Sequence, residues 1–385
     1  MDSRNSGRKG TSPLLDLQQQ GQSVWCDSIS RSLLDSGELR RMIAEDGLRG
    51  VTSNPSIFEK AIDGGTDYDG EIRTMAGAGF SATRIYEVLA IKDIQGAADQ
   101  FRALFETTGG GDGYVSLEVS PHLAHRTRET VEEARRLWKA VARPNLMIKV
   151  PATPAGMPAI RQLLGEGINV NVTLMFSMEH YLQVAEAYLQ GIETLAASGR
   201  TAPVASVASF FVSRVDTVVD KLLQDLESRA GSATEKERCR TLQGRAAVAN
   251  ARLVYRKFRE IFGGSRFLGL KRQGFRSQRP LWASTSTKNP RYRDVLYVET
   301  LIGPDTVNTM PLSTLSAFRD HGEVRATLEE DVEDARQTFV RLQEMGIDMD
   351  AVTLKLQQDG VKLFADAYDR LLASIQSKQQ AILSA

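Results

Sequence analysis

The sequence predicts an α/β fold, a (β/α)8 (TIM) barrel with extra helices and a disordered N-terminal arm. Short apolar segments alternate with amphipathic helical segments about eight times, which is typical of a parallel sheet covered by helices. The 385 residues exceed the roughly 250 that such a barrel needs, so additions to it are expected. An open doubly wound sheet is the alternative, but that fold usually carries a glycine-rich turn after its first strand. Asp27-Ser28-Ile29-Ser30 stands there instead, which favours the barrel.

The first half of the chain predicts four strand–helix units. Pro55 disfavours a helical conformation at Asn54 and can itself open a helix. Ser116 and Glu118 share one face of their strand because side chains alternate. The expected strands cover residues 24–27, 50–55 (a strand end and a turn), 114–119 and 145–151. The expected helices cover residues 29–44, 83–106 and 127–142, and the Gly- and Asp-rich residues 61–80 form a loop or a loose helical insertion.

The second half repeats the alternation. Its expected strands cover residues 167–173, 203–211, 280–284 and 306–311, with a weaker one at 295–298. Its expected helices cover residues 157–164, 178–192, 215–226 and 245–262, and two more near 325–345 and 351–376 close the chain. Residues 231–240 are a polar, charged break between two of these helices.

Domain organisation follows from composition. Residues 1–22 mix Ser, Gly, Arg and Gln without an apolar core, which predicts a flexible arm rather than a secretory signal. Residues 23–385 are expected to form a single barrel domain with C-terminal helices. Residues 231–279 are an insertion that is more basic than a barrel requires. It could be a lid, a contact for another subunit or, preferably, a solvated loop; a homo-oligomer is left open.

Charge and cysteine content exclude several classes of protein. Lys plus Arg and Asp plus Glu number 48 each, which argues against a broad basic surface for nucleic acid. Cys26 and Cys239 fit reduced thiols in the cytoplasm better than a disulfide framework. No apolar run approaches the roughly 18 residues that span a membrane. A cytoplasmic protein without nucleic-acid or membrane partners is therefore expected.

Lys149 lies inside the apolar strand expected at residues 145–151. A lysine is almost never fully buried without a partner. Desolvation disfavours an ammonium group, and a neutral lysine amine can attack a carbonyl to form a Schiff base. Taken alone, the stretch slightly favours a lysine that ends an edge strand and points into solvent.

Polar residues end or interrupt most of the other strands. A barrel brings the C-terminal ends of its strands together around one axis, where chemistry collects. The set would then offer an amine nucleophile, two carboxylates for proton transfer, and hydroxyls and amides that suit a polyol. The residues are Asp27, Thr52, Asn54, Ser116, Glu118, Lys149, Asn171, Thr173, Ser209 and Ser284. Arg214 and Lys288, just past two strands, would suit a phosphate on the substrate.

These segments carry a resemblance to a known family. The distinctive pieces are Thr52-Ser53-Asn54-Pro55-Ser56 and Asn169-Val170-Asn171-Val172-Thr173-Leu174-Met175-Phe176-Ser177. They stand in order with Trp25-Cys26-Asp27, Val115-Ser116-Leu117-Glu118-Val119, Met147-Ile148-Lys149-Val150-Pro151, Ser209-Phe210-Phe211-Val212-Ser213-Arg214 and Trp282-Ala283-Ser284-Thr285-Ser286-Thr287-Lys288. The chain resembles the transaldolases, class I (Schiff-base) barrel enzymes of the pentose phosphate pathway, over roughly residues 23–310.

The resemblance implies a mechanism and a set of roles. Lys149 would attack C2 of sedoheptulose 7-phosphate or fructose 6-phosphate, and Asp27 would take the C4 hydroxyl proton. Glu118 would shuttle protons through a water held with Thr173. The dihydroxyacetone unit would stay on Lys149 until glyceraldehyde 3-phosphate or erythrose 4-phosphate accepts it. No cofactor is implied.

The same resemblance assigns the binding residues. Asn54, Asn171 and Ser209 would bind the hydroxyls of the sugar. Thr52 and Ser116 would support the acid–base groups, and Phe211 would line the substrate site. Arg214, Ser284 and Lys288 would hold the phosphate. Many members have an arginine where this chain has Ser286, so Lys288 is the nearest cation at that point. A lysine binds phosphate as a point charge rather than with a bidentate fork.

Three alternatives stay open from the sequence. One is another Schiff-base aldolase that releases free dihydroxyacetone or its phosphate. Another is a catalytically silent barrel that binds sugar phosphates, against which the intact Lys149, Asp27 and Glu118 argue. A metal enzyme is the third. Only His122 and His125 are close together among the four histidines, and no third ligand stands near them, so no metal is expected.

Overall fold

The computed structural model describes residues 12–199 and 204–384. Eight parallel strands close into a barrel in chain order, with β8 pairing back onto β1 from Gln22↔Thr306 to Cys26↔Met310. The strands are β1 (Gln22–Cys26), β2 (Gly50–Val51), β3 (Tyr114–Glu118), β4 (Leu146–Pro151), β5 (Val170–Met175), β6 (Ser206–Phe211), β7 (Arg279–Ala283) and β8 (Thr306–Met310). The predicted (β/α)8 barrel is confirmed.

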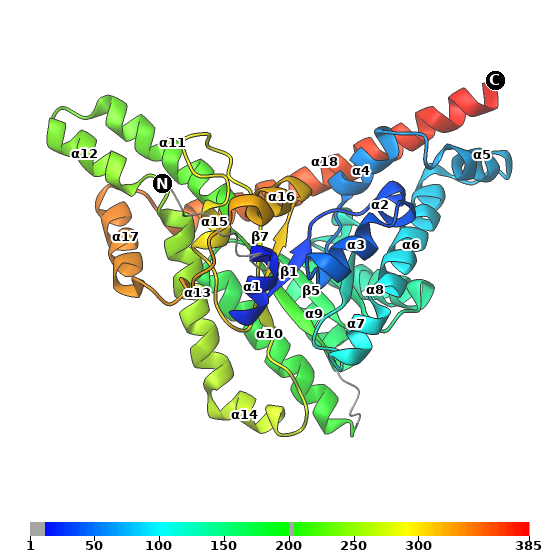
Figure 1. The fold of residues 1–385 in the computed structure, drawn as a ribbon, viewed down its shortest axis with the longest axis horizontal. Helices are drawn as coiled ribbons and strands as arrows, with labels where there is room; N and C mark the ends of the chain where they lie inside the picture. The colour runs from blue at the N-terminus through cyan, green and yellow to red at the C-terminus, as the bar shows by residue number, and fades with distance from the viewer. Residues whose placement is uncertain (1–11, 200–203, 385) are drawn as a thin grey trace, which may run out of the picture.

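Helices surround the barrel and extend beyond it (Figure 1). Those of the first half are α1 (Pro13–Gln19), α2 (Arg31–Asp35), α3 (Glu38–Glu45), α4 (Pro55–Asp63), α5 (Asp69–Gly77), α6 (Ala82–Gln100), α7 (Arg102–Thr107), a 3-10 turn (Pro121–Leu123) and α8 (Thr127–Val141). Those of the second half are α9 (Gly156–Gly165), α10 (Met178–Ala197), α11 (Ser213–Arg229), α12 (Ala233–Leu242), α13 (Ala246–Gly263), α14 (Ser265–Lys271), α15 (Leu296–Glu299), α16 (Leu312–His321), α17 (Val332–Glu344) and α18 (Met349–Ser384).

The N-terminal arm differs from the prediction. Residues 1–11 lie outside the described part of the chain. From Pro13 to Gln19 the chain is helical, and Leu14 and Leu17 are buried beneath β1 and α16. Two buried leucines one turn apart give this short helix an apolar face, so the flexible arm expected up to residue 22 is wrong for this stretch.

Further elements differ from the sequence expectations. The helix expected over 29–44 is split into α2 and α3. The insertion at 231–279, expected preferably as a solvated loop, contains α12, α13 and α14, with Phe258 and Phe262 of α13 buried. The polar break at residues 231–240 is helix α12, whose N-terminus carries a capping box between Ser232 and Glu235. The weak strand at 295–298 is the short helix α15. The long helix expected over 83–106 is split at Phe101 into α6 and α7. Of the two helices that close the chain, α17 starts at Val332 rather than near residue 325, and α18 ends at Ser384 rather than near residue 376.

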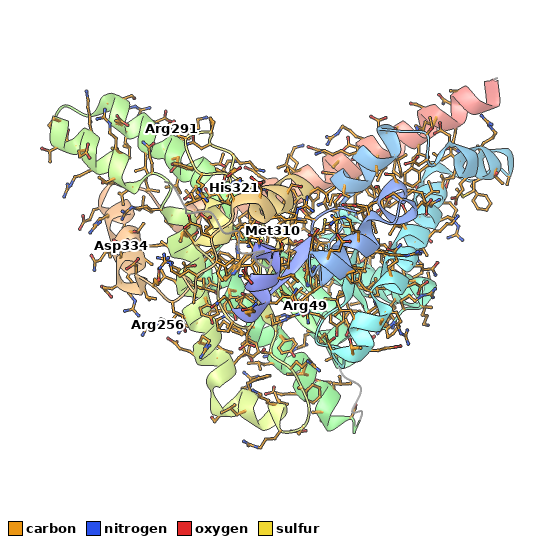
Figure 2. All side chains as sticks on the ribbon, in the orientation of Figure 1. Arg49, Arg256, Arg291, Met310, His321 and Asp334 are labelled. Atoms are coloured by element: carbon orange, nitrogen blue, oxygen red, sulfur yellow. The ribbon has the colours of Figure 1, made fainter. Side chains whose placement is uncertain are left out.

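The N-terminal end of the barrel carries a network of charged and polar side chains. At the N-terminal end, Asp112 accepts hydrogen bonds from Ser23, Arg49 and Arg279. Such a buried network serves stability, because the N-terminal face of these barrels carries no chemistry. Figure 2 labels Arg49, just before β2, and Met310, the last residue of β8.

Helix α18 covers the C-terminal end of the barrel. It packs against α4, α5 and β5 and runs outward past α5, as the red ribbon of Figure 1 shows. The side-chain amide of Gln357 donates to the carbonyls of Ala152, after β4, and Leu174, in β5. These bonds fix the helix to the ends of two neighbouring strands.

A strained residue lies under this helix. Leu174 has a φ of 62°, and the pairing of β5 with β6 shifts register between Val172 and Met175. A left-handed conformation is rare for a leucine and costs energy that the surrounding packing must supply. A Cβ on Gly360 of α18 would lie 2.9 Å from Cδ2 of Leu174, so glycine lets the helix pass over this bulge.

Candidate active site

Lys149 lies in β4, all six residues of which are buried. The residue is 4% exposed, and its Nζ donates to the carbonyl oxygen of Ser53 at 3.1 Å. Its amine lies 3.4 Å from Oε2 of Glu118 on the adjacent strand β3 and over the ring of Phe364, at 5.3 Å from the centroid. The lysine therefore points into the barrel, beside a carboxyl group and under α18.

Burial raises the pKa of Glu118 to about 7, against an opposing effect of the Lys149 ammonium and with a further upward effect of Asp27. Its Oε2 has no hydrogen-bond partner among the described residues, and neither does Oγ1 of Thr173 on β5. Buried polar atoms are normally satisfied, if not by protein then by water. Both atoms are therefore left to bond to something other than the described protein groups, and a carboxyl group with this pKa can act as acid and as base near neutral pH.

Asp27 follows β1 directly and is held by its neighbours. Its Oδ1 accepts a hydrogen bond from Oγ1 of Thr52 at 2.6 Å. The Thr52 oxygen lies 2.7 Å from Oγ1 of Thr309. Since Thr52 gives its proton to Asp27, Thr309 is the donor in the second bond. The chain of hydroxyls orients the carboxylate toward the barrel axis and leaves its other oxygen available.

A second polar chain crosses three strands below Lys149. Nδ2 of Asn171 donates to Oγ of Ser116 at 3.0 Å, and Oγ of Ser209 donates to Oδ1 of Asn171 at 2.6 Å. Both ends of the Asn171 amide are therefore engaged inside the protein. Asn54 caps α4, with its side-chain oxygen accepting from the amide of Ile57. That cap fixes the start of α4 beside the end of β2.

The front cavity, of about 290 Å³, opens above these residues. Ten of the thirteen residues predicted for the site line it, from six different strand ends and from α11: Asp27, Thr52, Asn54, Lys149, Thr173, Ser209, Phe211, Arg214, Ser284 and Lys288. Ser116, Asn171 and Glu118 do not line it. The first two lie beneath its wall, and Glu118 lies behind Lys149.

Cations gather on one side of the front cavity. The guanidinium of Arg214 lies over the ring of Phe211, 5.3 Å from its centroid, and burial lowers its pKa while Asp27 opposes the shift. Ser284, with a φ of 56°, contacts Ser213 through their hydroxyls at 3.0 Å. Lys288 donates to Oγ of Ser286 at 2.5 Å. Burial lowers the pKa of Lys288, and the charges of Arg214 and Lys60 add to this shift.

Sequence reasoning missed several lining residues. Lys60 of α4 faces the same cavity as Arg214 and Lys288. The only indication in the sequence is that Lys60 lies one turn after Ile57, in the helix that starts at Asn54-Pro55. Thr309 could have been found, because it is a polar residue near the C-terminal end of the strand expected at residues 306–311. Phe364 gave no signal, because an amphipathic helix of 36 residues does not reveal which residue meets the barrel.

The described residues carry no other obvious reaction centre. No group of three or more His, Cys, Asp or Glu side chains among them could hold a metal ion. His122 pairs with Asp369 at 2.8 Å and stacks edge-on against Tyr368. Within the described ranges, no helix combines the length and the apolar character that crossing a membrane requires.

The fold and the site together define a (β/α)8 barrel with a buried lysine and two carboxyl groups at the C-terminal ends of its strands, the end at which enzymes of this fold carry their active sites. Comparisons agree with this class. The profile of the family described as transaldolase/fructose-6-phosphate aldolase matches residues 24–375.

Relatives cover nearly the whole chain. A protein of Trichodesmium erythraeum named transaldolase is 44% identical over 96% of this chain and 98% of its own. Proteins of the same name from Thiobacillus denitrificans and Saccharopolyspora erythraea are 48% and 46% identical, each over 94% of this chain and over 98% and 96% of their own. The chain belongs to the transaldolase/fructose-6-phosphate aldolase family.

Proposed function

We propose that this protein is a transaldolase, which transfers a dihydroxyacetone unit from a ketose phosphate to an aldose phosphate through a Schiff base on Lys149. The observation that carries the proposal is the Lys149 amine held 3.4 Å from Glu118 inside the barrel, beneath a cavity with cations on one side. The unpaired thiols of Cys26 and Cys239 suit the proposed cytoplasmic location.

Formation of the Schiff base uses Lys149 and Glu118. The neutral amine adds to C2 of the ketose, and one proton of the amine passes to the C2 oxygen to give a carbinolamine. Glu118 then gives a proton to the C2 hydroxyl, which leaves as water, so that an iminium and the Glu118 carboxylate remain. Thr173, with its free hydroxyl, holds this water beside the carboxyl group.

Cleavage uses Asp27. Its carboxylate takes the proton of the C4 hydroxyl, the C3–C4 bond breaks, and its electrons pass into the iminium to give an enamine. The aldose phosphate leaves, and the dihydroxyacetone unit stays on Lys149. Thr52 and Thr309 keep the carboxylate aimed at C4. An aldose phosphate acceptor then enters, and the same steps run in reverse.

Three cations would hold the phosphate of the substrate. Arg214 and Lys288 are joined by Lys60, and the three lie along one side of the front cavity. The hydroxyls of Ser284 and Ser286 would add hydrogen bonds. With serine at position 286, Lys60 and Lys288 together replace the charge that an arginine would supply there, as point charges rather than as a fork.

The family also contains aldolases, which release the three-carbon unit to water. Phe364 favours transfer, because its ring covers the lysine amine and limits the entry of water at the covalent intermediate. Acceptor dependence distinguishes the two activities. Steady release of dihydroxyacetone from fructose 6-phosphate without an aldose phosphate would establish the aldolase instead.

The test of the proposal is reductive trapping. Borohydride added with fructose 6-phosphate should leave a reduced three-carbon adduct, which peptide mass spectrometry should locate on Lys149. Lys149→Met should give no adduct and no transfer. Lys139→Met, on the surface of α8, should give both at wild-type levels. An adduct on another lysine, or full transfer by Lys149→Met, would refute the mechanism.

A further inference from the structure

Glu118 faces a second cavity behind the active site. This rear cavity, of about 270 Å³, lies between α6, α8, α18 and the end of β3. The polar residues on its wall are Thr83, Tyr86, Glu87, Glu118, Ser120, Glu133, Arg136 and Tyr368. It has no lining residue in common with the front cavity. A part of the reaction centre therefore opens to the side opposite the substrate.

The contact between Lys149 and Glu118 joins the two cavities. Lys149 lines the front cavity only and Glu118 the rear cavity only, yet their charged atoms lie 3.4 Å apart. Within the described part of the chain, Oε2 of Glu118 has no hydrogen-bond partner. The carboxyl group thus reaches the amine from one side and has a roomy polar space on the other.

The rear cavity leads outward through groups that exchange protons. The Glu118 side chain is 6% exposed, whereas Arg136, at the other end, is 46% exposed. Arg136 pairs with Glu87 at 2.7 Å and with Glu133 at 2.9 Å. The rings of Tyr86 and Tyr368, which also line the cavity, stand edge to face with centroids 5.5 Å apart. Burial raises the pKa of the Tyr86 hydroxyl, and the charges of Tyr368 and Glu118 add to the effect. The neutral hydroxyl can therefore both donate and accept beside Glu118.

The chemistry at C2 needs such a passage. Each Schiff base that forms releases one water and consumes one proton of Glu118, and each that is hydrolysed consumes one water and returns the proton to Glu118. During these steps the sugar and its phosphate fill the front cavity, and Phe364 covers the amine. Water that entered from the front would also meet the covalent three-carbon unit. A separate passage that ends at Glu118 delivers water only where the carboxyl group controls its reaction.

We propose that the rear cavity is the water and proton passage of Glu118, with Tyr86 as the hydroxyl that connects the carboxyl group to solvent. The inference rests on the proposed Schiff base at Lys149. Tyr86 is a positioning residue, because it acts on the water and on Glu118 rather than on the sugar. The passage serves the formation and hydrolysis of the Schiff base and leaves cleavage of the C3–C4 bond to Asp27.

The test follows oxygen at C2. Fructose 6-phosphate labelled with oxygen-18 at C2 loses its label to solvent each time a Schiff base forms and is hydrolysed. Tyr86→Phe, which keeps the ring, should slow label loss and kcat by about tenfold while KM stays unchanged. Ala90→Leu, which places a larger side chain on the wall of the rear cavity, should slow label loss similarly. Tyr181→Phe, a buried tyrosine of α10 that lines neither cavity, is the matched control and should exchange at the wild-type rate.

The outcomes separate this inference from the function on which it rests. Label loss within twofold of wild type in both Tyr86→Phe and Ala90→Leu overturns the passage. So does a slowing that Tyr181→Phe shows equally. If wild-type protein neither exchanges the label nor forms a trapped adduct, the Schiff-base function fails first. If Ala90→Leu does not fold, Tyr86→Phe alone decides, because it removes one oxygen without changing the packing.

Discussion

Glu118 carries the carboxyl group nearest to the Lys149 amine, and its environment sets a pH range for the reaction. Burial raises its pKa to about 7, so it is protonated below that pH and ionised above it. Dehydration of the carbinolamine needs the protonated form. The rate of adduct trapping should therefore fall as the pH rises through about 7. Glu118→Gln should lose this dependence and trap about 10²–10⁴-fold more slowly. A variant that kept the wild-type pH profile would assign the transition to another group.

A second prediction for a single residue concerns Lys60. It adds a third positive charge to the phosphate side of the front cavity. Lys60→Met should raise KM for fructose 6-phosphate by about tenfold, the effect of losing about 1.4 kcal/mol of binding. Activity with unphosphorylated fructose should not change, because that substrate has no charge for the lysine to bind.

The control for Lys60 is a lysine without a role at the cavity. Lys355→Met, which removes an exposed lysine paired with Asp359 on α18, should leave both substrates unaffected. Equal losses with fructose and fructose 6-phosphate in Lys60→Met would mean that Lys60 supports the fold of α4 rather than the phosphate.

At the scale of elements, two aspartates hold the segment that carries Lys288. Asp216 and Asp220 lie one turn apart on α11, which also carries Arg214. Asp216 accepts from the hydroxyl of Tyr297 at 2.8 Å, and Asp220 accepts from that of Tyr292 at 2.6 Å. The same carboxylates accept from the backbone amides of Ala247 and Gly244. Helix α11 is thereby joined to the phosphate segment on one side and to the start of α13 on the other.

Asp216 makes stability depend on pH. Burial raises its pKa from 3.8 to about 7, so between these values the folded protein keeps a proton that the unfolded chain has lost. The free energy of unfolding should then fall as the pH rises through this window. Asp216→Asn should reduce that fall by roughly 2–4 kcal/mol in urea unfolding at several pH values. Asp225→Asn, at an exposed position of α11, should keep the wild-type slope; an unchanged slope in Asp216→Asn would contradict the assignment.

The sequence predicted elements where a single pattern dominates. Buried strands such as β4 read as apolar runs, and polar residues at their ends pointed to Asp27, Lys149 and Ser209. Prediction of secondary structure failed where the composition of a segment was compatible with both a helix and a loop. Helix α12 is polar enough to resemble a loop, because only Cys239 and Leu242 are buried. Lys60 and Phe364 were missed because tertiary packing alone brings α4 and α18 over the barrel. The behaviour of Asn171, with both ends of its amide engaged below the cavity, also depends on partners from β3 and β6.

For the whole molecule, α18 completes the reaction centre. Phe364 is 5% exposed and covers the Lys149 amine, whereas its neighbour Leu363 is 52% exposed. Phe364→Ala should admit water to the covalent intermediate and raise the release of dihydroxyacetone, relative to transfer, severalfold. Loss of the ring should also lower stability by about 3–5 kcal/mol, so thermal unfolding sets the working temperature. Leu363→Ala should change neither quantity. A Phe364→Ala protein that transfers without added hydrolysis would show that the ring does not exclude water.

The placement of α18 has a consequence for the newly made chain. Barrel closure needs β8 beside β1, and the cover of the amine needs Phe364, so the lysine acquires its surroundings late in synthesis. At about 5–20 residues per second, the ribosome takes roughly 10–40 s to pass from Lys149 to Phe364. In that interval, a nascent chain carries the Lys149 amine without the Phe364 ring that covers it. Synthesis of α18, rather than formation of the first strands, is then the step after which a sugar bound to the lysine becomes protected from water.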